Sequence, residues 1–172
     1  ALGCDRIVMG ENARLGDAGV IELNENFLFQ YVEAKLLTDV VRQVRDLATS
    51  KSRSPDLAEA LVDRSAVVYQ RIAEDGESRE FKIQYAEKGE DGEVEIEPEP
   101  PAAADGEPPW IIVPETRGNR FLEVNAAQGI ALGLCEETSP SLDEFLGTLQ
   151  ISEPPLQLRR TTADSVIFWL NY

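Results

Sequence analysis

The stretch GCDRIVMGENARLGDAGVI, residues 3–21, opens the fold and carries several of its local signals. Ile7, Val8 and Met9 form an apolar run that ends at Gly10, which predicts a buried strand over residues 5–9. The residues up to position 22 then predict a loop and a second short strand. A strand so close to the first residue raises the question of which segment precedes it in the fold.

The composition predicts one globular domain with a strongly acidic surface. The chain has 172 residues, of which 42% are hydrophobic, and this is enough to build a core. Lysine and arginine total 16 while aspartate and glutamate total 32, so the formal charge is −16. Because nucleic acids and anionic membranes repel such a surface, we expect no nucleic-acid partner. No apolar run approaches the roughly 20 residues that span a bilayer.

The chain contains no histidine, and this restricts the chemistry it can perform. A Ser-His-Asp triad, a Cys-His pair and an HExxH zinc site are all excluded within these 172 residues. Proton transfer near neutral pH must therefore use a carboxylate, a lysine, a cysteine or a group from outside the chain. Cys4 and Cys135 lie outside any CxxC motif, and we expect both to be core residues, with a disulfide between them as the alternative. No cofactor motif is present, so no cofactor is expected.

The longest predicted element is a helix over residues 27–48. Its apolar residues recur at helical spacing: Leu28, Val32, Leu36, Val40, Val44 and Leu47. The sequence SKSRSP then ends this helix, and Ser54 followed by Pro55 predicts the start of a short helix over residues 55–63.

The remaining segments alternate between predicted strands and helices, which indicates an α/β fold. Ser141 and Glu144 form a candidate capping box before the last of these helices. The predicted strands cover residues 66–73, 79–87, 110–115 and 121–125, and the predicted helices cover residues 126–136 and 142–149.

Residues 86–109 differ in composition from the rest of the chain. They hold nine acids and one lysine, for a net charge of −8, together with five of the ten prolines. We expect a surface insertion that does not pack, because such a segment buries too little apolar area to offset its ordering cost. A calcium site is the alternative, but the spaced ligands of a calcium loop are absent, so we expect no metal.

Three segments, in order, resemble ClpP-class serine peptidases, and in particular their membrane-bound branch, often called NfeD-type or signal-peptide-peptidase-like. GCDRIVMGENARLGDAGVI resembles the stretch just after the nucleophile, where a phrase like A-x-C-D-x-I-x-M precedes x-L-G-x-x-G. AKLLTDVVRQVRDLATSKSRSPDLAEALVD resembles the long helix and the turn after it. FLEVNAAQGIALGLCEETSPSLDEFLGTL resembles the closing segment. The resemblance covers nearly the whole chain apart from the acidic insertion.

The resemblance implies the ClpP/crotonase-like fold, built from repeated strand-strand-helix units, of which this chain would be the C-terminal portion. It implies a Ser-Lys dyad whose serine precedes Ala1, so that this chain alone is inactive. It also implies a homo-oligomer that acts on apolar segments of polypeptides. Residues 1–150 would form the ClpP-like portion, and residues 151–172 a C-terminal segment.

Lys35 is the residue that the resemblance places in the role of general base. In relatives the lysine stands at the start of the long helix, a little over three turns before a step that matches Asp46-Leu47-Ala48 here. On a helical wheel Lys35 falls beside Leu28 and Tyr31, and partial burial on such a face lowers the pKa of a lysine. A lysine that reaches solvent from the edge of the stripe is the alternative.

Two other functional interpretations remain open at this stage. A non-catalytic module of the same fold would serve oligomerisation or partner binding. The crotonase branch, which handles acyl-CoA, shares the fold but has no use for a lysine at position 35. The serines within the chain lack a nucleophile elbow, and Ser54 and Ser141 are expected to be helix caps.

The sequence SVIFWLNY, residues 165–172, resembles the phrase that precedes the first membrane span in the membrane-bound branch. Trp169 and Tyr172 suit the headgroup region, where amphipathic aromatic residues are favoured. We therefore expect the full-length protein to be membrane-associated through regions outside this chain, with this domain soluble and extracytoplasmic. An ordinary C-terminal strand is the alternative.

Overall fold

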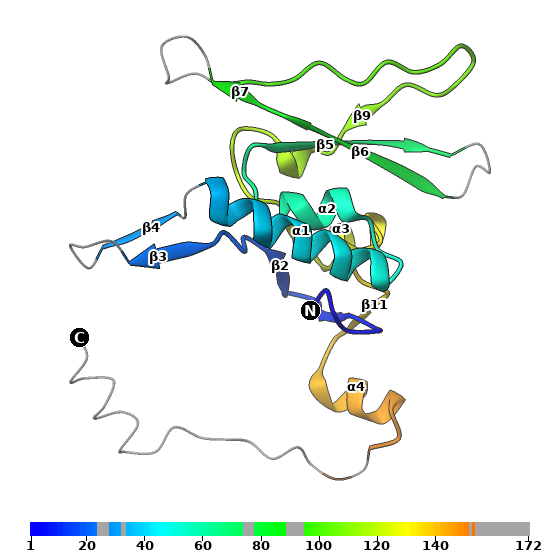
Figure 1. The fold of residues 1–172 in the computed structure, drawn as a ribbon. Coiled ribbons are helices and arrows are strands. Elements are labelled where there is room, and N and C mark those ends of the chain that lie inside the picture. Colours follow the sequence, from blue (N-terminus) through cyan, green and yellow to red (C-terminus); the bar gives the residue numbers. More distant parts are fainter. Residues whose placement is uncertain (24–27, 32–33, 74–77, 89–94, 152, 154–172) are drawn as a thin grey trace. The chain divides into compact units, whose positions relative to one another are not determined.

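The computed structural model describes residues 1–23, 28–31, 34–73, 78–88, 95–151 and 153. The chain divides into two compact units, Ala1–Ser139 and Pro140–Tyr172, so the division precedes the expected boundary between residues 150 and 151. The described residues form a mixed α/β structure with small sheets and four α-helices (Figure 1). The general α/β class expected from the sequence is thus confirmed.

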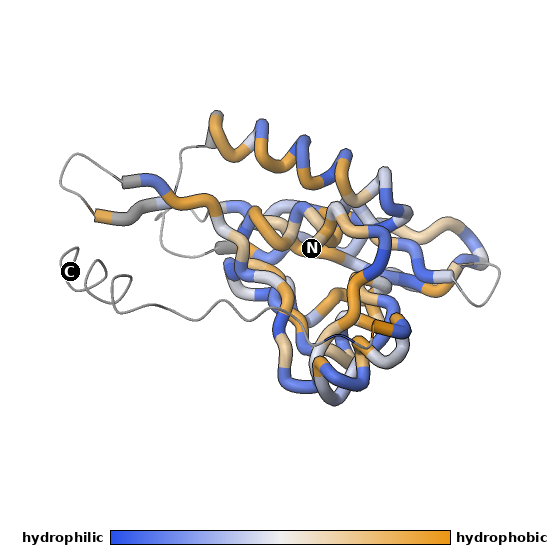
Figure 2. The backbone as a smooth tube through the Cα atoms, turned by 90° about the horizontal axis from the view of Figure 1, so that it is seen from below, coloured by the Kyte–Doolittle hydropathy of each residue, from blue (hydrophilic) through white to orange (hydrophobic). Residues whose placement is uncertain are grey.

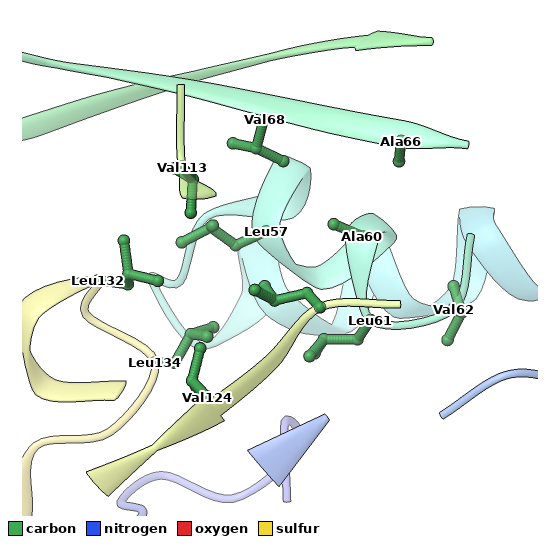
Figure 3. Packing of buried hydrophobic residues seen from close by; sticks show 11 residues of the cluster. Leu57, Ala60, Leu61, Val62, Ala66, Val68, Val113, Val124, Leu132 and Leu134 are labelled. Carbon is green, nitrogen blue, oxygen red and sulfur yellow. The ribbon is translucent and has the colours of Figure 1, made fainter. Parts of the chain in front are cut away.

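A three-stranded antiparallel sheet and two helices enclose the main core. The sheet has the order β6-β5-β9, with β5 at Ala66–Ile72, β6 at Arg79–Tyr85 and β9 at Ile111–Ile112. Helices α1 (Ala34–Ser50) and α2 (Pro55–Ala60) are in contact with each other, and α2 also contacts β5 and β6. Figure 3 shows Leu57 of α2 and Val68 of β5 pointing into the same cluster.

Helix α2 begins as the sequence predicts. The Ser54 side chain accepts a hydrogen bond from the Leu57 N–H at 3.3 Å, and Pro55 occupies the first helical position. Both features favour a helix that starts at Pro55. The Ser54 cap satisfies a backbone N–H that has no partner within the helix, and proline has no N–H that would need one.

Helix α1 begins later than predicted. The expected helix over residues 27–48 is wrong at its start, because Phe29–Tyr31 forms strand β4, which pairs antiparallel with β3 (Ile21–Leu23). Figure 2 shows α1 itself alternating between hydrophobic and hydrophilic residues. Leu28 and Tyr31 precede the helix, so the helical wheel that placed Lys35 beside them is wrong.

Two small sheets join the two ends of the first unit. Strand β1 (Val8–Gly10) pairs parallel with β11 (Glu137–Ser139), and β2 (Arg14–Gly16) pairs antiparallel with β10 (Glu123–Asn125). The β2–β10 approach requires a glycine at position 16. Its φ is +140°, and a Cβ there would lie 2.0 Å from the Leu122 carbonyl oxygen.

The segment after β10 forms a shorter helix than predicted. Helix α3 spans Ala126–Ala131 and not residues 126–136, and the chain turns away at Gly133, whose φ is +69°. An Asn125–Gln128 capping box starts this helix. Cys135 is buried as expected, but the expectation for Cys4 is wrong, because it is exposed; both thiols are free.

The other described elements are a 3-10 turn, a two-stranded ribbon and a short capped helix. A 3-10 turn, η1 (Pro114–Thr116), follows β9, and the hydroxyl of the buried Thr116 accepts from the Val68 N–H at 3.0 Å. Strands β7 (Glu87–Lys88) and β8 (Glu95–Ile96) form a two-stranded ribbon. In the second unit, α4 spans Leu142–Thr148 and the Ser141 side chain caps it, as predicted.

The acid-rich segment packs against the main sheet, which corrects the expectation of a surface insertion without contacts. We call residues 97–109 the acidic strap. In Figure 1 the strap runs along the side of the sheet away from α1 and α2. The Tyr69 hydroxyl donates to the Pro98 carbonyl oxygen, and Arg117 holds Glu97 through two hydrogen bonds of 2.8 and 3.0 Å. Residues 89–94 of the predicted insertion lie outside the described residues.

Arg71 fixes the far end of the strap. Its guanidinium donates to Glu107 and, through Nε, to Glu80 at 2.6 Å, and it lies 4.6 Å from the centre of the Trp110 ring. The hydrogen bond from Arg71 and the N–H of Ala104 lower the pKa of Glu107. The acids of the strap are therefore partly neutralised by arginines, and this allows an acidic segment to pack.

The strap covers the face of β5 that the helices do not cover. Val67 and Tyr69 alternate with the core residues Ala66 and Val68 along the strand, so they point to the opposite face. Both are nearly fully buried.

We predict that replacing residues 97–109 by a glycine-serine segment of equal length destabilises the domain by about 3 kcal/mol, because Val67 and Tyr69 become exposed. Chemical denaturation at high ionic strength, where the charge difference is screened, measures this change. The matched control replaces only the exposed residues 102–106 and leaves the stability nearly unchanged. Equal stabilities of the strap variant and the natural chain would show that the strap adds nothing to the fold.

Candidate functional site

Lys35 is the second residue of α1, so the one residue predicted to be catalytic lies in the first turn of the longest helix. Its side chain lies outside the described residues. Lys35 is four residues after Tyr31, the last residue of β4. Because an extended chain spans at most about 3.6 Å per residue, the Cα atoms of Tyr31 and Lys35 are at most about 14 Å apart. Lys35 is therefore tied to the surroundings of Tyr31.

Tyr31 lines an open groove in the first unit. The groove has a volume of about 740 Å³. Its walls come from segments far apart in the sequence, including β2, β4, the region of η1 and the start of α3. The residues lining it are Arg14, Asp17, Tyr31, Arg64, Pro114, Glu115, Asn119, Arg120, Phe121, Glu123, Asn125 and Gln128.

Two aromatic rings form one wall of this groove. The centres of the Tyr31 and Phe121 rings are 5.4 Å apart and the rings are tilted by 56°. A glycine makes room for them, because a Cβ at Gly19 would lie 2.4 Å from Phe121 and 3.0 Å from Tyr31. The Arg64 guanidinium lies 5.3 Å from the centre of the Tyr31 ring.

The charges of the groove balance, in contrast to the rest of this acidic chain. The lining residues include three arginines and three carboxylates. Arg14 pairs with Glu123, and the Gln128 side chain donates to Glu115 at 2.5 Å. Sequence reasoning missed this groove, because no two of its arginines are near each other along the chain.

One flank of α1 is apolar and exposed. Leu36 and Leu47 share this face at 100° per residue. Leu36 is 53% exposed and Leu47 is 42% exposed, while Val40, Val41 and Val44 pack against the main core. Near the end of this flank, Gly3 lies against the Leu47 side chain. The first residues of the chain thus lie at the end of α1 opposite to Lys35.

The buried guanidinium of Arg53 fixes these first residues. The Arg53 side chain is 2% exposed and donates to Glu136 Oε1 at 2.7 Å and to the carbonyl oxygens of Leu2 and Cys4 at 3.1 and 2.7 Å. The second oxygen of Glu136 accepts from the Ile7 N–H at 2.5 Å. Arg53 and Glu136 together hold residues 2–7 in place at the entry to β1; we call these contacts the N-terminal anchor.

The anchor also changes the acidity of its neighbours. Burial raises the pKa of Glu136, but the Ile7 N–H and the Arg53 guanidinium outweigh it, so the pKa is lowered. Burial and the nearby Glu136 charge raise the pKa of the Cys135 thiol. Cys135 therefore stays protonated near neutral pH and is a poor nucleophile.

Of the other features predicted from the sequence, some are described by the structure and some lie outside the described residues. Ser54 and Ser141 are helix caps, as expected. Within the described part of the chain, no three acidic or cysteine side chains are grouped closely enough to hold a metal ion. The described helices include none that is long and apolar enough to cross a membrane. The aromatic end at residues 165–172 lies outside the described residues.

Comparison of the chain with protein-family models, with curated proteins and with solved structures finds no match in any of the three.

We predict that Arg53→Ala destabilises the first unit by about 3 kcal/mol, because it removes three hydrogen bonds of a buried guanidinium, two of them to backbone carbonyls. Urea denaturation measures the loss. The control is Arg6→Ala, which breaks the exposed Arg6–Glu137 pair and costs about 1 kcal/mol or less. Equal losses in both variants would show that the anchor is no more important than a surface ion pair.

Proposed function

We propose that this chain is the C-terminal portion of a membrane-anchored serine endopeptidase of the ClpP class, with a ClpP/crotonase-like fold and Lys35 as its general base. The resemblance of three segments, in the right order, is the main support. The mixed α/β structure is compatible with it, and Lys35 stands in the first turn of the long helix as the resemblance implies.

The exposed flank of α1 supports a serine supplied by a preceding segment. That flank presents the exposed side chains of Leu36 and Leu47, which are suited to contact with another helix. Because Gly3 lies at Leu47, a helix before Ala1 that runs back along α1 would need about 12 residues, or about 18 Å, to reach the level of Lys35. A serine at its far end would then lie beside Lys35.

In this arrangement the neutral Lys35 amine accepts the proton of the serine hydroxyl as the serine oxygen attacks the carbonyl carbon of the substrate. The same proton passes to the leaving amine when the peptide bond breaks, and water then hydrolyses the acyl-enzyme. The substrates are apolar segments of polypeptides, and the active assembly is a homo-oligomer. The parent protein is held at the membrane by regions outside this chain, beginning with about 20 apolar residues after Tyr172.

We predict that Lys35→Ala in the parent protein lowers turnover of an apolar peptide by at least about 100-fold, because the serine loses its base. Hydrolysis of a fluorogenic peptide measures this. Lys82→Ala, at an exposed residue of β6, is the matched control and keeps nearly full activity.

Full turnover by the Lys35→Ala variant would contradict the assignment. A parent gene without a G-x-S-x-x-A-like phrase before Ala1 would instead favour the non-catalytic module, which would use the exposed residues Ile21, Leu28 and Leu36 for assembly.

A further inference from the structure

Two arginines in the groove form no ion pair within the described part of the chain. Among the described residues, neither Arg64 nor Arg120 has a carboxylate within ion-pair distance. Arg120 donates to the Pro114 carbonyl oxygen at 3.0 Å, and Arg64 lies over the Tyr31 ring. These contacts position the two guanidiniums while leaving most of their N–H donors free for a ligand.

The neighbouring carboxylates do not satisfy these arginines, because most are already engaged. Glu123 pairs with Arg14, and Glu115 accepts from Gln128. Asp17 has neither an ion pair nor a side-chain hydrogen bond to any described residue, so it remains available as an acceptor. The groove therefore offers a cationic part and a separate acceptor.

A buried acceptor in the wall is also unsatisfied. The Asn119 side-chain oxygen is inaccessible to solvent and has no hydrogen-bond partner among the described atoms. Asn119 holds a positive φ of 51°, which is uncommon outside glycine, and lies next to Arg120. Buried acceptors usually have hydrogen-bond partners. A ligand N–H that reaches the Asn119 oxygen after a small movement of the loop would therefore gain a hydrogen bond.

The size and charge of the groove restrict the ligand. A volume of about 740 Å³ is in the range that holds a short peptide end or a small molecule. The formal charge of −16 repels polyanions, so nucleic acid and strongly acidic polymers are unsuitable. A ligand with one carboxylate, N–H donors and an apolar side chain matches the arginines, Asp17 and the ring pair of Tyr31 and Phe121.

We propose that this groove binds the free C-terminal carboxylate of a peptide whose last residue is apolar. Arg64 and Arg120 bind the carboxylate, the Tyr31–Phe121 pair contacts the terminal side chain, and Asp17 accepts from a peptide N–H. This site does not depend on the peptidase proposal, since the residues that form it all lie within the first unit and binding requires no serine.

The test compares two peptides that differ only at the carboxylate. A short peptide ending in phenylalanine is titrated into the 172-residue chain, once as the free acid and once as the C-terminal amide, with isothermal titration calorimetry. We expect the free acid to bind at least about ten-fold more tightly, because charge-assisted hydrogen bonds to arginine are lost in the amide. The preference weakens as salt is added.

Variants then assign the preference to the groove. Arg64→Ala and Arg120→Ala each reduce the preference for the free acid, and the double variant removes it. Arg42→Ala is the matched control, because Arg42 is an exposed arginine on α1 that pairs with Asp39 and does not line the groove. Circular dichroism confirms that each variant is folded.

Three outcomes would overturn the proposal. They are equal affinity for acid and amide, no binding of either at millimolar peptide, and a preference that survives in the double variant. None of them bears on turnover by the parent protein, so failure here and failure of the peptidase proposal are distinguishable.

Discussion

The arrangement of the first unit depends on the hydrogen bonds of the buried Arg53 side chain. It stands just before α2 and binds Glu136, just before β11, together with the backbone of residues 2 and 4. One side chain therefore connects the beginning, the middle and the end of this unit. Because a guanidinium presents several donors in a rigid plane, a lysine in the same place would not reach all three partners. The parallel pairing of β1 with β11 and the position of Gly3 against Leu47 involve residues next to those that Arg53 binds.

Local signals predicted those elements whose residues determine their own conformation. Ser54 and Pro55 gave the start of α2, and the alternation along residues 79–85 gave β6. Helix α1 was misplaced at its start because Leu28 and Val32 continue its apolar spacing in the sequence, whereas residues 29–31 pair with β3, a contact that no local pattern encodes. The acidic strap was missed for a related reason. Its composition predicts no packing, whereas Arg71 and Arg117, which neutralise it, come from other segments.

The candidate site shows the same division between local and long-range information. Lys35 was identified through a resemblance between segments, and the structure places it in the first turn of α1. The groove beside Tyr31 was not predicted, because Arg14, Arg64 and Arg120 are brought together only by the pairing of β2 with β10 and by the turns around them. Single arginines in an acidic chain look like ordinary surface charges. The role of each arginine depends on which carboxylates lie near it in the folded chain.

We propose that this chain supplies the base, and a preceding segment the nucleophile, of one serine peptidase site. Labelling the parent protein with a fluorophosphonate, followed by mass spectrometry of the labelled peptides, tests this proposal. We expect a single labelled serine in the segment before Ala1, with slower labelling when Lys35 is replaced. A labelled serine within residues 1–172, or the absence of any labelled serine in a folded parent protein, would contradict it.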